Sequence, residues 1–414
     1  MPLTSEQVKI VKSTVPVLET YGAIVTAHFY SNMLRENPEL KNIFNTTNQT
    51  NGHQSRALAG AVYAYAAHID DLGALSPAVQ RICHKHASLY IRPDQYEIVG
   101  KYLLGAFQEV LGDAFTPEVR DAWAAAYWQL AKIMIDVEEN LYREADGWTD
   151  WRNFRLDKKV PESEEITSFY LTPEDGKPLP LYKPGQYISV RVKVPGLQHY
   201  QCRQYSLSDS PGNEYYRISV KKDQGLDSAT AQTESHPGLI SNHLHNSVQV
   251  GDIIQVSCPK GDFYLEETKS KSPIVLISAG VGLTPLLSML NTLASTDSDR
   301  PIHWIHATHS RFRQAFRAHV QTVAKSHDNV RVTVFNKLPS DDDVLGRDYH
   351  YAGRIDLNRL DRISDLHLDN KSTEYFVCGP TTFMTDTERV LLGFGVDASR
   401  IHVELFGTGG VPPV

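Results

Sequence analysis

The sequence has few cysteines and no excess of positive charge. Its four cysteines, Cys83, Cys202, Cys258 and Cys378, are scattered along the chain and form no C-x-x-C pair. We therefore expect neither a disulfide framework nor a structural zinc site, and a reducing compartment fits this usage. The net charge of −8 provides no cationic field for phosphate groups, so nucleic acid is not an expected partner.

A membrane span and a targeting leader are also missing from the pattern. The longest apolar stretch, 273–290, is interrupted by Gly280, Gly282 and Pro285, which predicts a strand, a glycine loop and a helix in place of a membrane span. The first residues, MPLTSEQVKI, contain neither a charged segment with an apolar core nor an Arg-rich amphipathic leader. This start predicts a cytoplasmic protein.

Changes in periodicity divide the 414 residues into three expected domains. Apolar residues recur every three or four positions from Thr4 to about Arg143, which predicts an all-α domain over residues 1–146. Short runs such as 187–194 then alternate apolar with polar residues. This second pattern predicts an antiparallel β domain over residues 147–268.

The remaining residues, 269–414, follow a third pattern. Apolar strands alternate there with helical patterns, as a parallel α/β sheet requires. The expected strands are 274–278, 302–307, 330–335 and 375–378. The polar, acidic segment 223–237 has no periodicity, so we expect an exposed loop inside the β domain.

His86 lies in the middle of an apolar stripe on a predicted helix. Ile82, Cys83, Leu89 and Tyr90 surround it at helical spacing, which places the imidazole among apolar side chains. A lone histidine in such a stripe is most often a core residue bonded to a backbone carbonyl. Metal ligation is the alternative, and other residues must decide between them.

Glu138 occupies a comparable position in a later predicted helix. An unpaired carboxylate buried there would cost several kcal/mol, so we expect it to have a partner. An imidazole N–H is a natural partner, because a carboxylate behind a metal-ligating histidine fixes its tautomer and strengthens it as a donor. Tyr96 can complete this group, or it can begin a helix with its hydroxyl in water.

The segments around these residues resemble those of flavohaemoglobins. The proximal haem segment of that family is similar to residues 84–88 and 93–100, and its distal segments are similar to residues 26–30 and 51–54. The resemblance implies that His86 is the proximal iron ligand and that Tyr96 and Glu138 are its hydrogen-bonded partners. It also implies that Lys85 tunes the redox centres.

The same resemblance implies a distal pocket lined by Tyr30, Gln54 and Leu58, with Phe44 packed against the porphyrin. Dioxygen bound to ferrous iron takes on superoxide character, so a hydroxyl donor such as Tyr30 would stabilise the developing charge. His53 is the adjacent alternative for a distal donor. Another alternative is that Tyr30 and Gln54 only stabilise helix contacts.

A second set of motifs predicts a flavin site. The sequence from Arg203 to Ser206 matches the R-x-Y-S motif of the ferredoxin reductase family. In that motif the arginine can pair with a flavin phosphate, and Tyr205 can pack on the isoalloxazine ring. A helix start at Gly238 can offer backbone N–H groups to the pyrophosphate. The expected FAD-binding residues are Tyr187, Arg203, Gln204, Tyr205, Ser206 and Ser241.

A third set of motifs predicts a nicotinamide nucleotide site. A glycine loop follows the predicted strand 274–278 and opens a helix, which is the required context for an anion-binding helix start. Such a loop is often only a strand-to-helix turn. Here the later segments 378–380 and 404–407 complete the pattern of the ferredoxin reductase family. The resemblance implies that Glu404 is a catalytic residue. The expected nucleotide-site residues are Gly280, Val281, Gly282, Leu283, Thr284, Pro285, Cys378, Gly379, Pro380, Leu405, Phe406, Gly407 and Thr408.

Two residues depart from the family pattern. Leu283 stands where many relatives have a polar residue, and Thr408 stands where the terminal motif usually has proline. Arg311 or Arg313 could meet a 2′-phosphate, although surface arginines are the favoured interpretation. The choice between NADH and NADPH therefore stays open.

The resemblance extends over almost the whole chain. It implies a globin domain with haem b, a β-barrel domain with FAD and an α/β domain that binds NADH or NADPH. It further implies a monomeric nitric oxide dioxygenase, in which electrons pass from the nicotinamide through FAD to haem and dioxygen and nitric oxide become nitrate. Two other functions remain as alternatives: a haem-linked ferric or hydroperoxide reductase, and an oxygen-binding sensor.

Overall fold

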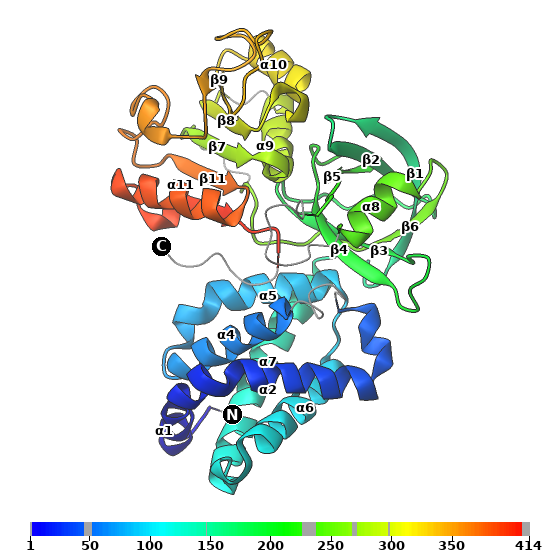
Figure 1. Cartoon of the computed structure of the whole chain (residues 1–414), viewed down its shortest axis with the longest axis vertical. Helices are drawn as coiled ribbons and strands as arrows, with labels where there is room; N and C mark the ends of the chain where they lie inside the picture. The colour runs from blue at the N-terminus through cyan, green and yellow to red at the C-terminus, as the bar shows by residue number, and fades with distance from the viewer. Residues whose placement is uncertain are drawn as a thin grey trace. The chain divides into compact units, whose positions relative to one another are not determined.

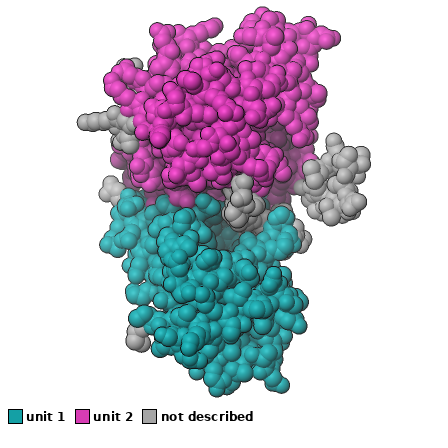
Figure 2. Space-filling model, turned by 90° about the vertical axis from the view of Figure 1, so that its left-hand side faces the viewer, with its two compact units in different colours: residues 1–151, 189–203 teal, residues 152–188, 204–414 magenta. Residues whose placement is uncertain are grey.

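The computed structural model describes residues 2–44, 52–145, 147–225, 237–266, 271–296 and 299–407. Its contacts divide the chain into two compact units (Figure 2). The first unit comprises residues 1–151 and 189–203, and the second comprises residues 152–188 and 204–414. The expected domain boundaries after residues 146 and 268 are finer than this division and stay predictions.

The part of the first unit that precedes residue 147 is helical (Figure 1). The helices are α1 (Ser5–Ser13), α2 (Val15–Glu36), α4 (His53–Ala67), α5 (Ser76–Ser88), α6 (Pro93–Leu111) and α7 (Pro117–Arg143), with 3-10 turns at η1 (Pro38–Asn42), η2 (Leu72–Leu75) and η3 (Gly112–Ala114). Proline stands in the first turn of α5, α6 and α7, where its missing N–H leaves no intrahelical bond unmade. The expected all-α domain is therefore present.

The α2 and α4 helices approach each other closely, and this contact places the distal candidates. A Cβ atom built on Gly22 would lie 3.6 Å from the Cβ atom of Ala59. The buried Thr26 hydroxyl donates to the backbone oxygen of Ser55 at 2.8 Å. Thr26 lies one turn before Tyr30, so the contact fixes that side chain against the start of α4.

Six strands form an antiparallel sheet in the order β4-β3-β6-β1-β2-β5. Their bounds are β1 (Arg152–Pro161), β2 (Ile166–Pro173), β3 (Tyr187–Val192), β4 (Gln201–Ser206), β5 (Tyr216–Lys221) and β6 (Ile253–Val256), with helix α8 at Leu239–Asn246. Lys159 on β1 donates to the backbone oxygens of Leu244, His245 and Val248. This cation satisfies carbonyls at the end of α8 and fixes the helix to the sheet.

The second sheet is parallel, with the order β10-β9-β8-β7-β11-β12. Its strands are β7 (Ile274–Ala279), β8 (Ile302–Thr308), β9 (Val330–Asn336), β10 (Tyr351–Ala352), β11 (Glu374–Cys378) and β12 (Ile401–Glu404), and the helices are α9 (Leu283–Ser295), α10 (Arg317–Ser326) and α11 (Thr381–Gly393). Along β7, Ile274 and Leu276 pack into one core, whereas Val275 and Ile277 pack into another. Both faces of the sheet are thus covered, as the apolar strands predict.

The predicted fold class is confirmed: an all-α part, an antiparallel sheet and a parallel α/β sheet follow each other along the chain. All four cysteines are free thiols. Within the described ranges, no helix is both long enough and apolar enough to cross a membrane. Most of the expected loop at 223–237, namely residues 226–236, lies outside the described residues.

Candidate functional site

The proximal candidates meet where α5, α6 and α7 pack together. The Nδ1 atom of His86 lies 2.8 Å from Oε1 of Glu138 and 3.1 Å from the hydroxyl of Tyr96. The Tyr96 hydroxyl donates to the same carboxylate oxygen at 2.6 Å. The structure therefore brings together the three residues that the sequence singled out, and Tyr96 does not place its hydroxyl in water.

These contacts determine which imidazole nitrogen is available. Glu138 is buried, with 3% of its side chain exposed, whereas 32% of the His86 side chain is exposed. A carboxylate accepts hydrogen bonds, so Nδ1 of His86 carries the proton and Nε2 keeps its lone pair. Burial, together with the charge of Glu138, raises the pKa of Tyr96, which keeps this hydroxyl a donor. The donor set fits a haem iron held by Nε2 of His86.

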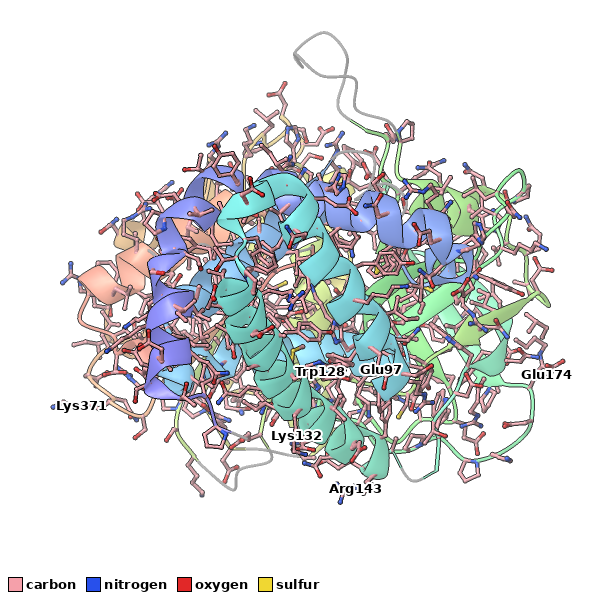
Figure 3. All side chains as sticks on the ribbon, turned by 90° about the horizontal axis from the view of Figure 1, so that it is seen from below. Glu97, Trp128, Lys132, Arg143, Glu174 and Lys371 are labelled. Carbon is pink, nitrogen blue, oxygen red and sulfur yellow. The ribbon has the colours of Figure 1, made fainter. Side chains whose placement is uncertain are left out.

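The α7 helix presents Glu138 to this site because its other face is polar. Lys132 has 72% of its side chain exposed and pairs with Asp136 at 3.4 Å. Figure 3 shows Lys132 and Arg143 on the outer side of α7. Glu138 is the charged residue of α7 that is buried, and an uncompensated buried charge would strongly destabilise the helix packing. Its two hydrogen bonds remove that penalty.

The end of α5 differs from the expected helix. We expected Leu89 and Tyr90 to continue the apolar stripe, but α5 ends at Ser88 and Tyr90 has a φ of 58°. The N–H groups of Leu89 and Ile91 both donate to the backbone oxygen of His86, a helix ending that usually has glycine at the left-handed position. Tyr90 holds this conformation because its ring stacks on Tyr142 at 6.2 Å.

Tyr90 and Tyr142 are therefore supporting residues that the sequence analysis missed. The Tyr142 hydroxyl donates to the backbone oxygen of Ile91 at 2.7 Å, so α7 also holds the segment that follows the candidate ligand helix. No local motif reveals this role. The signal is indirect: the helix ends without glycine, so tertiary contacts must stabilise its left-handed residue.

The distal candidates also meet. Tyr30 on α2 is buried, its hydroxyl is hydrogen-bonded to the Gln54 side chain, and burial raises its pKa above the usual value. The ring of Phe44 meets the Tyr30 ring edge-on at 5.6 Å, and Leu58 packs against the same core. His53, the first residue of α4, is exposed, so the geometry favours Gln54 over His53 as the partner of Tyr30.

Two further predictions concern Lys85 and the distal segment 51–54. Lys85 lies next to His86 on α5, with its side chain partly buried. Asn51, which begins one of the distal segments, lies outside the described residues.

The Cys83 thiol is buried beside Glu138, and burial raises its pKa. A neutral thiol is a poor metal ligand, which leaves the imidazole of His86 as the ligand candidate here.

The flavin motifs lie on neighbouring strands. Tyr187 begins β3 and exchanges backbone hydrogen bonds with Lys260, and Ser206 is the buried last residue of β4. Gly185 has a φ of 110°, and a Cβ atom on it would lie 2.5 Å from the backbone oxygen of Phe263. Only glycine fits this close turn, so the backbone itself requires Gly185 directly before β3.

The other expected FAD residues are partly buried or already bonded. Arg203, Gln204 and Tyr205 lie on β4 and are partly buried. Ser241, in the first turn of α8, donates to the backbone oxygen of Gly238 and accepts from the N–H of Asp223. Its hydroxyl therefore helps to fix the start of α8, and the backbone N–H groups there are the available anion donors.

The nucleotide loop packs directly on the end of β11. A Cβ atom on Gly282 would lie 2.5 Å from the carbonyl carbon of Cys378 and 2.7 Å from the backbone nitrogen of Gly379. Gly280 has a φ of 55°, a conformation that suits glycine. Gly282 is thus required by the backbone and Gly280 is favoured by its φ, and the loop fits the close approach that a nucleotide phosphate needs.

The remaining loop residues have structural contacts of their own. Leu283 is buried in the core beneath α9, which explains the apolar residue at a position that is often polar. Val281 packs against the same core, and the Thr284 hydroxyl donates to the backbone oxygen of Val281 at 3.0 Å. Pro285 stands in the first turn of α9, where it costs no helical hydrogen bond.

A polar row crosses the carboxyl edge of the parallel sheet. Strand register places Cys378 beside Glu404 on one side and beside Ser278 on the other, and Ser278 pairs with His306. The Ser278 hydroxyl lies 2.8 Å from Nδ1 of His306. Burial and then the charge of Glu404 raise the pKa of the Cys378 thiol. The thiol is therefore neutral.

Ser278 and His306 were not among the predicted site residues. Their signal is a polar residue at the end of an otherwise apolar strand, at the sheet edge where α/β proteins bind nucleotides.

The other predicted residues near this edge have varied surroundings. Pro380 is the N-cap of α11, Leu405 packs against the apolar core on one face of the parallel sheet, and Phe406 is 44% exposed. The N–H of Gly407 donates to Leu405, and Thr408 lies outside the described residues.

Replacing Gly282 by Ala should weaken nucleotide binding at least about tenfold, or about 1.4 kcal/mol. The new methyl group would displace the loop from Cys378 and Gly379. Calorimetric titration of the full chain with ADP-ribose measures the effect. The matched control is Gly393→Ala on α11, where a Cβ atom meets nothing within 4 Å. Equal affinities of the two variants would show that the loop does not hold the nucleotide.

Three family models match successive parts of the chain. The globin model matches residues 27–134, the oxidoreductase FAD-binding domain matches residues 153–264, and the oxidoreductase NAD-binding domain matches residues 276–389. These matches confirm the predicted haem, FAD and nicotinamide nucleotide cofactors at the level of the domain. They also support an oxidoreductase.

Full-length relatives share this order of domains. The chain is 48% identical to the flavohemoprotein of Bordetella parapertussis, over 99% of this chain and 100% of that protein. It is 47% identical to the flavohemoprotein of Deinococcus radiodurans, over 98% of this chain and 97% of that protein.

Solved structures agree with these relatives. The flavohemoglobin of Malassezia yamatoensis, determined with bound FAD and heme, superposes with a TM-score of 0.83 at 30% identity, over 98% of this chain and 100% of that chain. The flavohem-like FAD/NAD-binding domain of nitric oxide dioxygenase from Vibrio cholerae is 36% identical, with a TM-score of 0.54, over 62% of this chain and 99% of that chain. The chain therefore belongs to the flavohaemoprotein family.

Proposed function

We propose that this flavohaemoprotein is an NAD(P)H-dependent nitric oxide dioxygenase that converts nitric oxide and dioxygen into nitrate. The observation that carries the proposal is the buried Tyr30 hydroxyl, bonded to Gln54 in the globin pocket. The Vibrio cholerae protein named above, whose FAD/NAD-binding domain is similar, is described as a nitric oxide dioxygenase. Haem would supply the iron at which the two gases combine, and FAD would convert hydride into single electrons.

The proximal residues would favour oxygen activation over reversible carriage. Glu138 accepts the Nδ1 proton of His86 and is itself buried. A carboxylate in this position makes the opposite ring nitrogen a stronger donor. Tyr96 bonds the same carboxylate oxygen, so it holds the geometry of the pair and shields it from water.

The distal residues would hold a proton where negative charge develops. Burial raises the pKa of Tyr30, so its phenol stays protonated and can donate to an anionic oxygen. Gln54 fixes the direction of that hydroxyl. Phe44 packs against the same ring, and Tyr30 is buried, so a hydrogen bond from its hydroxyl would act in a low local dielectric, where it is stronger than in water.

Tyr30→Phe should speed dissociation of dioxygen from the reduced protein by about 10- to 100-fold, because one hydrogen bond to a charged acceptor is worth about 1.5–3 kcal/mol. Stopped-flow displacement by carbon monoxide measures the rate. Tyr65→Phe is the matched control: Tyr65 is also buried, and its hydroxyl donates to the backbone oxygen of Ala126 at 2.8 Å. An unchanged rate in Tyr30→Phe would remove this residue from the proposed role.

One experiment separates dioxygenation from the alternatives. Oxygenated, reduced protein is mixed anaerobically with an equal amount of nitric oxide, and nitrate is measured. Dioxygenation predicts rapid decay and about one nitrate per haem. Slow decay without nitrate would instead favour the ferric or hydroperoxide reductase, and a long-lived complex with little nicotinamide consumption would favour the oxygen sensor.

The remaining predictions concern the nicotinamide cofactor, the oligomeric state and the location, and they belong to this proposal. Arg311 pairs with Asp343 at 3.2 Å, and Arg313 lies 3.9 Å from Glu165. Arg313 is 45% exposed, which supports its interpretation as a surface residue, whereas Arg311 is 26% exposed and pairs with a buried carboxylate. Both arginines already have acidic neighbours, and the choice between NADH and NADPH stays open. A monomeric state and a cytoplasmic location also remain predictions.

A further inference from the structure

Asp209 joins the flavin-motif strand to the helix that follows the nucleotide loop. It comes shortly after Ser206, the last residue of β4. Its backbone oxygen accepts from the Ser288 hydroxyl on α9 at 2.6 Å. Its Oδ1 atom accepts from Nδ2 of Asn291, one turn further along α9, at 2.8 Å. Two adjacent turns of α9 therefore bond to one residue of the antiparallel part.

The other side of Asp209 is bonded within the antiparallel part. Its Oδ2 atom accepts from the hydroxyl of Tyr215 at 3.0 Å and lies 3.1 Å from Nη1 of Arg217. Only 15% of the Asp209 side chain and 8% of the Arg217 side chain are exposed. Arg217 also donates to the backbone oxygen and hydroxyl of Ser208. The carboxylate is therefore held firmly, because a buried ion pair is stable only when its other polar atoms are also bonded.

The bonds continue beyond α9. Asn291 accepts at Oδ1 from Nε2 of His319 on α10, at 2.7 Å. The guanidinium of Arg217 also lies 5.1 Å from the ring centre of Phe316, the residue before α10. Helices α9 and α10 both cover the parallel sheet. The polar network from Arg217 through Asp209 and Asn291 to His319 thus reaches from β5 to two helices of the nucleotide-binding part.

This placement matters because each end of the network adjoins a cofactor motif. Asp209 follows the R-x-Y-S strand, and α9 begins directly after the glycine loop at Gly282. Hydride transfer requires reacting atoms about 3–3.5 Å apart, and a displacement of about 1 Å can cost about 100-fold in rate. Sheet hydrogen bonds do not connect the two sheets among the described strands. A shared apolar core, which includes Ile166 and Phe263, and a backbone bond from the N–H of Glu164 to the oxygen of Phe312 also join the two parts. The Asp209 network adds polar, directional bonds beside both cofactor motifs.

We infer that Asp209 is a positioning residue for hydride transfer: it aligns the flavin strand with the nucleotide helix. In that step the C4–H bond of the reduced nicotinamide breaks, and the hydride with its electron pair forms the N5–H bond of the flavin. The nicotinamide is oxidised and the flavin is reduced by two electrons. The inference rests on the oxidoreductase half of the proposed function and is independent of what the haem does with the electrons.

The test removes the α9 side of the network and leaves Asp209 in place. The double variant Ser288→Ala, Asn291→Leu keeps the ion pair with Arg217 and the flavin motif. Its matched control is Thr292→Val on the same helix, because the Thr292 hydroxyl donates within α9, to the backbone oxygen of Ser288. Asp209→Asn, which removes the charge facing Arg217, is the second test variant.

Flavin reduction by NADH in anaerobic stopped flow should slow about 10- to 100-fold in the double variant. FAD content and the Kd for ADP-ribose should stay within about twofold of the unaltered protein. Hydrogen exchange of the peptide 283–295 should become faster, and Thr292→Val should change none of these values. Nitrate formation by chemically reduced, oxygenated protein should be unaffected, which separates this inference from the proposed dioxygenase activity.

Two results would overturn the inference. Unchanged flavin reduction in both test variants would show that the network does not align the cofactors. Loss of FAD in both, with the remaining flavin reduced at the normal rate, would make Asp209 a flavin-retaining residue instead. Slow reduction with FAD retained, and a primary isotope effect with NADH deuterated at C4, would support the positioning role.

Discussion

His86→Ala should yield a protein that retains less than about a tenth of its haem, because the iron loses its strongest protein ligand. The Soret absorbance per chain would fall accordingly, and the flavin bands would remain. Glu138 and Tyr96 would also lose their shared partner, so α5 and α7 would pack less firmly. A spectrum of the purified full chain, with haem assayed chemically, measures the result.

His84→Ala is the matched control for this variant. His84 stands on the same helix and is partly buried to a similar degree, yet the resemblance assigns it no iron contact. Added imidazole should restore haem binding to His86→Ala, which distinguishes a missing ligand from a damaged fold. A normal Soret band in His86→Ala, without added imidazole, would move the ligand role to another residue.

The sequence could predict the order of the three folds because each has its own periodicity. Apolar spacing of three to four residues marks the helices, and alternation marks strands with one covered face. The apolar run at 274–277, and the run at 302–307, which is apolar apart from His303 and His306, mark strands that are covered on both faces. The division into compact units could not be predicted from periodicity. Residues 189–203 belong to the unit that contains the helices because of tertiary contacts, such as the one between the hydroxyls of Ser189 and Ser88 at 2.9 Å.

The candidate site was predictable where a single residue breaks a pattern. Glu138 is a charge within an apolar stripe, and burial of a charge demands a partner. Leu283 was harder to interpret, because only the structure shows that it fills the core beneath α9. Tyr90 was misplaced on a helix for a related reason: its left-handed conformation depends on stacking with Tyr142, which is distant in sequence.

Residues that act through networks could not be found from sequence. Asp209 stands in a polar segment, where an acidic residue is ordinary, and its partners Tyr215, Ser288 and Asn291 come from separate elements. The pairing of Ser278 with His306 likewise depends on strand register. Register is a property of the assembled sheet, since a shift of one residue would turn each side chain to the opposite face.

Two buried histidines predict how stability depends on pH. His306 and His303 both have a pKa lowered from 6.5 to about 4, with burial as the main cause. His303 is satisfied as a neutral ring: Nδ1 donates to the backbone oxygen of Asp365, and Nε2 accepts from the Thr333 hydroxyl. His306 bonds Ser278 through Nδ1. Protonation would place a positive charge in each buried site.

The unfolded chain therefore binds these protons at a higher pH than the folded protein does. Stability should be greatest above pH 6.5, should fall as the pH drops from 6.5 to about 4, and should level off below that for these two groups. At about 1.4 kcal/mol for each unit of pKa difference, each histidine should account for a loss of about 3 kcal/mol. The direction follows from the excess of protons bound by the unfolded state.

Urea unfolding of the full chain at pH 7 and pH 4.5 measures this loss, with the fluorine signal of 5-fluorotryptophan at Trp304 as the local probe. Trp304 lies 6.3 Å from the His306 ring on the same strand. His306→Asn keeps a bond to Ser278 without a titrating group, so its stability should fall by about 2.5 kcal/mol less between the two pH values. Equal losses in the unaltered protein and in His306→Asn would mean that the pKa of His306 is the same in the folded and the unfolded chain, which would contradict the prediction.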